Sequence, residues 1–329
     1  MPHRPDIGTV GRVPNVSELA VSPAGSRDLP CPVRADPVAV HGFLTAACAA
    51  ERQRLVAEHP SVLGALDGAP PALRYAANDL LMHAAGPPYR DRDGRYLLFD
   101  PRGRGRIARV FGDLAAADRI TVLVPGAGNR VVNFWNGVGG EGYRSPSAQA
   151  AVLYEAACRR AGNPGRLAVI AWLGYDTPNG NDLAVARQER AQAGALALRR
   201  FLAGLVVVCP RASIALFGHS YGSTVIGLAA SGLPARVSDV AVFGSPGMGV
   251  DNAAQLGIDA RLWAGQSTRD WIRWVPRSRL FGFGHGTKPA DPRFGARVFP
   301  TSDVADHDHY LSPGTDSLSS LARIAAGRP

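Results

Sequence analysis

Residues 213–223 constrain the fold most, because a strand-like apolar run ends in Gly-His-Ser-Tyr-Gly and continues into a helix of small residues. A strand-to-helix reversal this tight needs small residues two positions before and two after its central residue. Gly218 and Gly222 hold those positions around Ser220. In a chain with 38 glycines the motif alone is weak, but its strand and helix context is specific. The pattern predicts a nucleophile elbow that exposes the Ser220 hydroxyl; the alternative is an ordinary glycine-bracketed turn.

Length and charge narrow the class of protein. A chain of 329 residues can bury one large core, and enzymes built on a single α/β domain often reach this size. The net charge of +9 comes from scattered arginines, with Lys288 the one lysine. No basic stripe, helix-turn-helix pattern or RNA-binding signature accompanies that charge. We therefore expect a small-molecule substrate and no nucleic-acid partner; the oligomeric state stays open.

The cysteine spacing and the hydropathy of the sequence indicate where in the cell the protein is expected. The four cysteines, at 31, 48, 158 and 209, show neither C-x-x-C nor zinc-like spacing, which favours reduced thiols. The N-terminus has no apolar signal-peptide core, and no uninterrupted apolar run approaches the roughly 18 residues of a membrane span. The sequence predicts a cytoplasmic protein.

Composition divides the chain into three parts. Residues 1–36 are rich in Pro, Gly, Ser and Arg and predict a weakly ordered arm. Residues 37–90 show helical periodicity broken by Pro60 and Pro70-Pro71, which predicts an extension of two or three short helices. Residues 91–329 alternate strand and helix patterns and predict the catalytic domain.

The strand pattern predicts an α/β fold with a mostly parallel central sheet and helices on both faces. A short connection at residues 100–103 predicts that the first two strands form a hairpin. Helices are expected over Ser147–Ala161 and Leu183–Gly204. The expected strands are Tyr96–Phe99, Ile107–Phe111, Ile120–Val124, Ala168–Trp172, Ile214–Phe217, Val240–Phe243, Arg261–Ala264 and Arg297–Phe299.

A serine hydroxyl needs a base to take its proton. In folds with this elbow the order along the chain is serine, acid, then a histidine after the last strand. His307, in Asp-His-Asp-His-Tyr-Leu, follows the last expected strand and is our first choice, with the terminal helical segment expected to begin just after it. His309 and His285 remain alternatives, whereas His219 lies inside the elbow and cannot turn back onto its neighbour.

The base needs a carboxylate to hold its tautomer. Asp270 follows the strand Arg261–Ala264 after a short turn, as a triad acid beyond the seventh strand would. Asp251, after the sixth strand, is the alternative acid. Asp270 also suits a plain helix N-cap ahead of Trp271, which requires no catalysis.

Acyl transfer further needs backbone N–H donors for the developing oxyanion. Tyr221, directly after the nucleophile, should supply one. The glycine-rich loop 124–129 follows the third strand, and Ala127 is its expected donor. The loop lacks both the Gly-Lys-Ser/Thr of a P-loop and the third glycine of a dinucleotide fingerprint.

Residues near the elbow and the oxyanion loop are candidates for the substrate pocket. Aromatic side chains in these loops suit either an apolar acyl pocket or the core, namely Tyr143, Tyr175, Trp274, Phe281 and Phe283. The residues we expect to line the pocket are Gly126, Asn133, Phe134, His219 and Trp271.

A metal site is the competing interpretation of the same region. His307 and His309 alternate along the chain, so on an extended segment they share a side. No second ligand cluster with suitable spacing appears elsewhere in the sequence. We expect no metal and no cofactor.

With these residues placed, the chain resembles the actinobacterial α/β-hydrolase family of unknown function. The similarity covers about residues 59–325. It implies an α/β-hydrolase fold and a triad of Ser220, Asp270 and His307, and it implies no substrate. The loop 127–129 departs from the methionine and threonine more usual there, which changes pocket shape but keeps a backbone donor. The shared motifs lie at 59–64, 66–70, 74–78, 124–126, 218–223, 244–247, 270–272, 291–296 and 307–310.

The leading hypothesis is a cofactor-independent serine hydrolase that cleaves a carboxylic ester or thioester through an acyl-enzyme on Ser220. Acyl transfer to another alcohol or amine would use the same residues. A non-catalytic scaffold that binds an apolar ligand or a partner protein is the alternative from another class.

Overall fold

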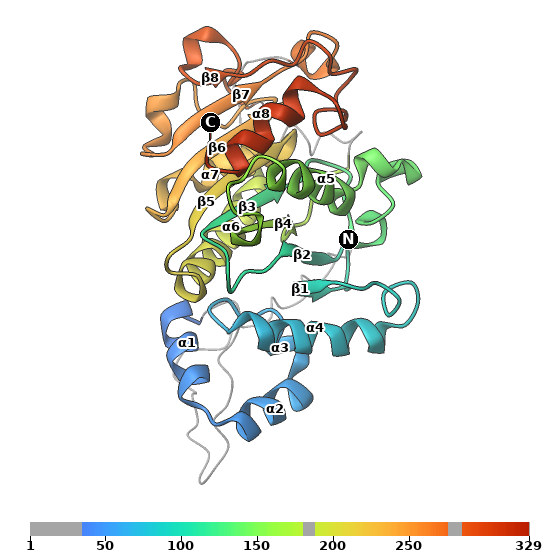
Figure 1. Cartoon of the computed structure of the whole chain (residues 1–329). Helices are drawn as coiled ribbons and strands as arrows, with labels where there is room; N and C mark the ends of the chain where they lie inside the picture. Colours follow the sequence, from blue (N-terminus) through green and yellow to red (C-terminus); the bar gives the residue numbers. More distant parts are fainter. Residues whose placement is uncertain (1–34, 180–187, 276–284, 329) are drawn as a thin grey trace, which may run out of the picture.

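The computed structural model describes residues 35–179, 188–275 and 285–328. A single eight-stranded sheet in the order β1-β2-β4-β3-β5-β6-β7-β8 forms its centre (Figure 1). The strands are β1 (Arg95–Asp100), β2 (Arg106–Gly112), β3 (Arg119–Val124), β4 (Leu167–Leu173), β5 (Ser213–His219), β6 (Val237–Phe243), β7 (Arg261–Gly265) and β8 (Arg297–Val298).

Strand pairing is parallel from β4 through β3 to β8 and antiparallel at the β1 end. β1 and β2 form the expected hairpin, and β2 then runs antiparallel to β4. All eight strand regions expected from the sequence are present, so the predicted mostly parallel sheet is confirmed.

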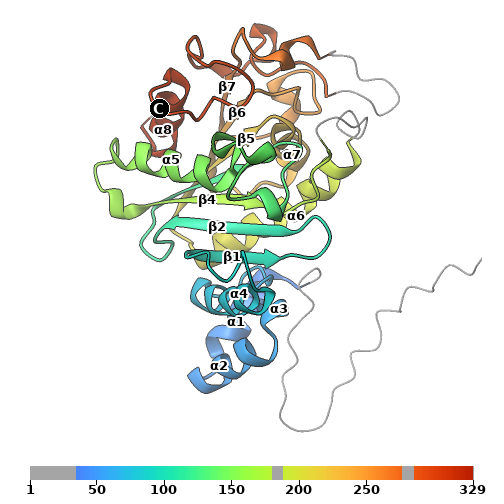
Figure 2. The same cartoon turned by 90° about the vertical axis from the view of Figure 1, so that its right-hand side faces the viewer.

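The central strands are buried on both faces. Every residue of β3 and β4 is buried, as their uninterrupted apolar sequences predict. One apolar cluster lies on the sheet face covered by α6 and α7, and a second lies on the face covered by α5 and α8 (Figure 2). The covering helices are α5 (Pro146–Cys158), α6 (Glu189–Val208), α7 (Tyr221–Ala229) and α8 (Asp316–Ala325).

The bounds of three helices differ from the sequence-based expectation. The helix α5 ends at Cys158 rather than at Ala161. The helix α6 runs four residues past the expected end at Gly204, and the expected start at Leu183 lies outside the described residues. The helix α8 begins at Asp316 rather than directly after His307, because Pro313 and Gly314 intervene and the Thr315 side chain accepts a hydrogen bond from the Leu318 N–H as N-cap.

The N-terminal extension contains four helices, not two or three. They are α1 (Pro37–Ala46), α2 (Ala49–Glu58), α3 (Pro60–Leu63) and α4 (Pro71–Ala85). Pro60 and Pro71 occupy first helical positions, where a missing N–H is tolerated, so each proline begins a helix. The helix α4 packs on β1 and α1 packs on α6, which joins the extension to the sheet (Figure 1).

Within the described residues, α6 alone is long and apolar enough by composition to cross a membrane. Eight of its twenty residues are buried in the fold, among them Leu198, Phe201 and Leu202. Two of its polar residues, Arg199 and Arg200, donate hydrogen bonds to backbone carbonyl groups of other segments. This is the pattern of an amphipathic core helix.

Candidate active site

Ser220 lies at the reversal between β5 and α7. Its φ of 52° makes it the one non-glycine residue with positive φ in the described part of the chain. A Cβ on Gly222 would lie 2.3 Å from the Val124 carbonyl oxygen, and a Cβ on Gly218 would lie 2.9 Å from the Ser223 Cα. Neither contact has room to relax because both involve backbone. The two glycines are therefore required by the tight turn that presents Ser220.

Three side chains from distant segments form one hydrogen-bonded series. The Ser220 Oγ lies 2.9 Å from the His307 Nε2, and the His307 Nδ1 lies 2.9 Å from the Asp270 Oδ1. Ser220 follows β5, Asp270 follows β7, and His307 lies between β8 and α8. Asp270 is fully buried, while Ser220 and His307 are 9% and 7% exposed. The arrangement matches the serine, base and acid geometry of nucleophilic catalysis.

Asp270 is held by further donors. Its Oδ2 accepts from the Tyr310 hydroxyl at 2.7 Å, and its Oδ1 also accepts from the Ile272 N–H at 2.8 Å. Burial by itself raises the pKa of this carboxyl. Hydrogen bonds from the His307 ring, the Tyr310 hydroxyl and the backbone N–H outweigh burial, so the pKa lies below its ordinary value. One Asp270 side chain thus both caps the short helix that begins at Trp271 and bonds to His307.

The alternative histidines and acid lie elsewhere. The His309 ring bonds to Asp306 at 2.6 Å and stacks on Tyr143. The His285 ring lies 3.4 Å from the Thr224 hydroxyl, and Asp251 is exposed. The structure brings none of the three into the hydrogen-bonded series with Ser220.

His219 supports the loop that carries His307. Its Nε2 lies 2.7 Å from the His307 carbonyl oxygen, and its ring stacks on Phe243. Burial, followed by the neighbouring His307 ring, lowers the pKa of His219 to about 4. His219 is therefore neutral at pH 7 and donates to that carbonyl group from Nε2.

The loop after β3 lies directly over Ser220. A Cβ on Gly126 would lie 2.7 Å from the Ser220 Cβ, so only glycine allows this approach. Ala127 and Tyr221 both line the pocket above the serine. Tyr221 is the first residue of α7, where backbone N–H groups have no acceptor within the helix. Both residues expected to donate to an oxyanion thus line the same pocket as Ser220.

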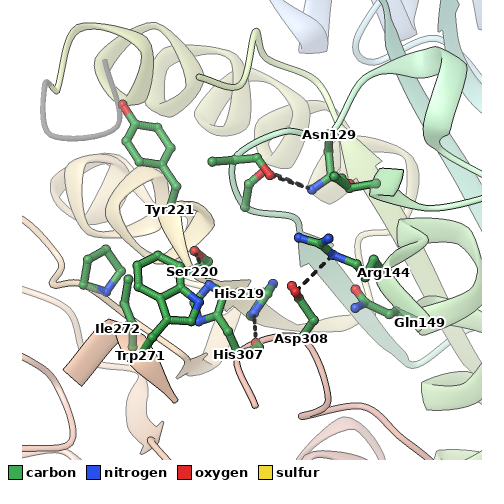
Figure 3. Close-up of a pocket in the computed structure, with 14 residues that line it drawn as sticks. Asn129, Arg144, Gln149, His219, Ser220, Tyr221, Trp271, Ile272, His307 and Asp308 are labelled. Atoms are coloured by element: carbon green, nitrogen blue, oxygen red, sulfur yellow. Dashed lines mark hydrogen bonds and ion pairs between the residues drawn. The ribbon is translucent and has the colours of Figure 1, made fainter. Parts of the chain in front are cut away.

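A pocket that opens to solvent lies above Ser220 (Figure 3). On one side of Ser220, the polar side, lie Arg144, Gln149 and Asp308, and on the other side lie Trp271 and Ile272 (Figure 3). Asn129 is the fourth polar residue of the lining, and Val138 and Pro246 add apolar surface. Of the pocket residues expected from the sequence, Gly126, His219 and Trp271 are present; the four polar residues were not anticipated.

Two expected pocket residues are elsewhere. Phe134 is fully buried in the core cluster beneath α5, because its apolar ring packs between sheet and helix rather than facing solvent. The Asn133 side chain instead donates to the Gly128 carbonyl oxygen at 3.0 Å and accepts from the Arg130 N–H at 2.8 Å. Asn133 therefore shapes the oxyanion loop from behind.

The other aromatic candidates are divided between core and surface. Tyr175 is buried and donates to the Pro125 carbonyl oxygen at 2.7 Å. Tyr143 is 40% exposed and Trp274 is 77% exposed. Phe281 and Phe283 lie outside the described residues.

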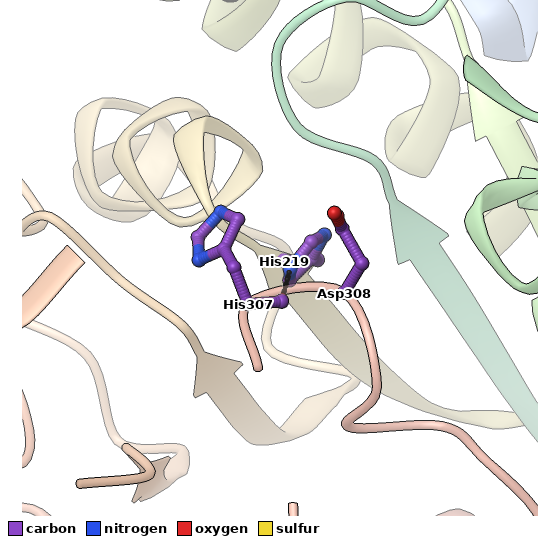
Figure 4. A group of neighbouring side chains, drawn as sticks. All are labelled: His219, His307 and Asp308. Carbon is purple, nitrogen blue, oxygen red and sulfur yellow. Dashed lines mark hydrogen bonds between the residues drawn. The ribbon is translucent and has the colours of Figure 1, made fainter. Parts of the chain in front are cut away.

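A metal interpretation fits these residues poorly. In the described part of the chain, His219, His307 and Asp308 have ligand atoms within 4.8 Å of one another (Figure 4). Both ring nitrogens of His307 are already bonded, one to Ser220 and one to Asp270. The proposed pair of His307 with His309 does not form this group, because the His309 ring bonds to Asp306. His307 therefore has no ring nitrogen free for a metal.

A sequence model of the family described as Alpha/beta hydrolase matches residues 100–279, more than half of the chain. The chain belongs to this alpha/beta hydrolase family. Ser220 and Asp270 lie within the matched residues, and His307 lies beyond them. The resemblance and the α/β-hydrolase fold predicted from the sequence are confirmed.

Curated relatives are mycobacterial and uncharacterized. Rv2079 of Mycobacterium tuberculosis strain H37Rv is 30% identical over 370 residues, covering 88% of this chain and 55% of the relative. Rv0963c of the same strain is 41% identical over 154 residues, covering 45% of this chain and 54% of the relative. The chain spans about half the length of each of these relatives.

Similar solved structures include a dienelactone hydrolase from Anabaena variabilis and esterase PE8. The first is 16% identical with a TM-score of 0.39, covering 70% of this chain and 94% of its own. The second is 15% identical with a TM-score of 0.43, covering 68% of this chain and 99% of its own.

Proposed function

We propose that this protein is a serine hydrolase that cleaves a carboxylic ester or thioester through an acyl-enzyme on Ser220. The observation that carries the proposal is the continuous hydrogen-bonded series from Ser220 through His307 to the buried Asp270. The series opens into a pocket lined by both polar and apolar side chains, as ligand sites commonly are. We expect it to work without a cofactor.

The first half of the reaction forms the acyl-enzyme. The Ser220 Oγ attacks the acyl carbon while the His307 Nε2 accepts the hydroxyl proton. Asp270 stabilises the resulting imidazolium through Nδ1, and the Ala127 and Tyr221 N–H groups bind the oxyanion. When the tetrahedral intermediate collapses, the bond to the leaving group breaks and His307 returns the proton to that oxygen or sulfur.

The second half releases the acid. A water molecule loses a proton to the His307 Nε2 and attacks the acyl carbon. Collapse of this second intermediate breaks the bond to the Ser220 Oγ, which regains its proton from His307. An alcohol or amine in place of water would give acyl transfer with the same residues.

The test is covalent labelling of the full chain with a fluorophosphonate probe, alongside hydrolysis of p-nitrophenyl esters from acetate to laurate. Ser220→Ala should abolish labelling and lower the rate by about 10⁶-fold, because triad members act as a unit. Ser231→Ala, at an exposed serine just beyond α7, is the matched control and should behave like the wild type.

Mass spectrometry of the labelled protein should place the adduct on the peptide that contains Ser220. If a folded, monodisperse wild type takes up no label and cleaves no ester, the non-catalytic scaffold becomes the better description.

A further inference from the structure

Among the described residues that line the pocket, Arg144 is the one arginine or lysine and Asp308 is the one carboxylate. Arg144 ends the short helix η3 (Gly142–Arg144), and its guanidinium projects into the pocket on the polar side (Figure 3). Its Nε lies 3.0 Å from the Asp308 Oδ2. A permanent cation therefore lies beside the residue that directly follows His307.

The guanidinium is only partly used by the protein. The Asp308 contact is an ion pair without hydrogen-bond geometry, since the buried Nε has no hydrogen-bond acceptor. Within the described residues, the two Nη atoms have no acceptor either. An arginine carries five N–H donors in a fixed fork, so the four Nη–H donors have no acceptor among the described residues and can serve a ligand.

The backbone on both sides of Arg144 is held by hydrogen bonds of buried side chains. The Gln149 Nε2 donates to the Tyr143 carbonyl oxygen at 2.9 Å, and the Ser145 hydroxyl donates to the Phe134 carbonyl oxygen at 2.8 Å. Ser145 is fully buried and Gln149 is 8% exposed. Because the backbone is held at both sides of Arg144, its side chain is presented to the pocket at little cost in ordering.

We propose that Arg144 binds an anionic oxygen group of the substrate, a carboxylate or a phosphate, held away from the scissile carbonyl. The inference rests on the proposed function and names its substrate class: an ester or thioester that carries a negative charge. A carboxylate or phosphate matches the two Nη atoms in a bidentate manner, while Asp308 occupies the Nε side and keeps the fork in place. A purely aliphatic acyl chain would leave these donors unpaired on displacing water.

The experiment compares matched pairs of substrates. Mono-4-nitrophenyl glutarate and 4-nitrophenyl pentanoate differ by the terminal carboxylate on the acyl side. Acetyl phosphopantetheine and acetyl pantetheine differ by a phosphate on the leaving-group side. The wild type should prefer the anionic member of at least one pair by about 10- to 100-fold in kcat/KM, as hydrogen bonds to a charged group imply.

Variants at Arg144 test the cause of that preference. Arg144→Gln should remove the preference, chiefly by raising KM, and Arg144→Lys should keep part of it because the charge stays while the fork is lost. Arg166→Gln is the matched control, since Arg166 forms an exposed pair with Asp118 at the opposite end of the sheet and should leave the preference intact. Thermal unfolding of each variant verifies its fold.

The outcomes separate this inference from the proposed function. Equal rates on both members of both pairs, or a preference that survives Arg144→Gln, overturn the inference and leave the serine hydrolase standing. If Arg144→Gln does not fold, the comparison with Arg144→Lys decides.

If no ester or thioester is cleaved, calorimetry on Ser220→Ala with monomethyl glutarate against dimethyl glutarate tests the anion site directly. Binding of the monoester, but not of the diester, that disappears in Ser220→Ala/Arg144→Gln supports the site; no binding, or binding that survives this change, overturns it.

Discussion

Asp239 and Asp270 are both fully buried carboxylates, yet their partners differ in kind. Asp239, near the start of β6, bonds to Arg119 at 2.7 Å, to Arg261 at 2.8 Å and to the Trp263 indole at 3.0 Å. Asp270, beyond the end of β7, bonds to the imidazole of His307 and the hydroxyl of Tyr310. The first cluster lies where the parallel strands begin, and the second where they end.

The difference separates structure from chemistry. Arginine partners stay charged at every accessible pH, so at neutral pH the Asp239 cluster has one electrostatic state and serves to join β3, β6 and β7. The partner of Asp270 is a histidine, which can gain and lose a proton during a reaction cycle. A buried carboxylate therefore suggests catalysis only when its partner can change charge.

The largest expected effect is a loss of activity when Asp270 is replaced. Asp270→Asn should lower kcat/KM for a p-nitrophenyl ester by about 10⁴-fold, because the amide no longer enforces the His307 tautomer. Asp251→Asn, at the exposed alternative acid, is the control and should retain wild-type rates. Retention of more than a tenth of the activity by Asp270→Asn would remove Asp270 from the proposed triad.

The next effect is on stability at Asp239. Asp239→Asn should lower the free energy of unfolding by about 3 kcal/mol, because two arginines lose their shared counterion. Arg119 keeps backbone acceptors at Ile324 and Ala325, and Arg261 is 40% exposed, which limits the loss. Urea unfolding measures the change, while kcat per folded molecule should match the wild type. A loss of activity without a loss of stability would contradict the structural role.

The smallest expected effect is the dependence of the Asp239 contribution to stability on acid pH. Burial raises the pKa of Asp239, but bonds from Arg261, Arg119 and Trp263 outweigh it and lower the pKa from 3.8 to about 2. A carboxyl whose pKa is lower in the folded than in the unfolded state stabilises the fold at pH values above the unfolded-state pKa, and this stabilisation is lost as pH falls through the folded-state pKa. For Asp239 the contribution to the free energy of unfolding is about 2 kcal/mol, lost between about pH 4 and 2. The stability difference between wild type and Asp239→Asn should therefore shrink across that window. A difference that stays constant would show that Asp239 does not titrate as proposed.

Much of the fold could be predicted because buried strands leave uninterrupted apolar runs in the sequence. The hairpin of β1 and β2 followed from a short connection of turn residues. Strand order depends on pairing between distant segments, and no local pattern encodes it. Helix ends were less predictable at prolines, because a proline can either interrupt a helix or occupy its first position. Pro60 was interpreted as an interruption, but it begins α3.

The candidate site divides in the same way. Ser220, Asp270 and His307 could be proposed from chain order alone, because the topology fixes where each strand ends. Arg144 and Gln149 could not, because they lie between β3 and β4 on a segment whose path over the sheet is set by packing. The one available signal was the position of Asp308 directly after His307. Phe134 was misplaced because an aromatic residue among polar neighbours looks the same in sequence whether it faces solvent or core.

The docking of α4 on β1 has a consequence for solubility. β1 is the last strand at its side of the sheet, and the Asn78 side chain of α4 donates to the Tyr96 carbonyl oxygen at 2.8 Å. A register shift between Tyr96 and Leu98 further interrupts this edge, and the opposite edge is the two-residue strand β8. Covered, bulged or very short edges resist strand-to-strand aggregation. A chain shortened to begin at β1 would bare hydrogen-bonding groups and the apolar surface under α4, and would self-associate into sheets.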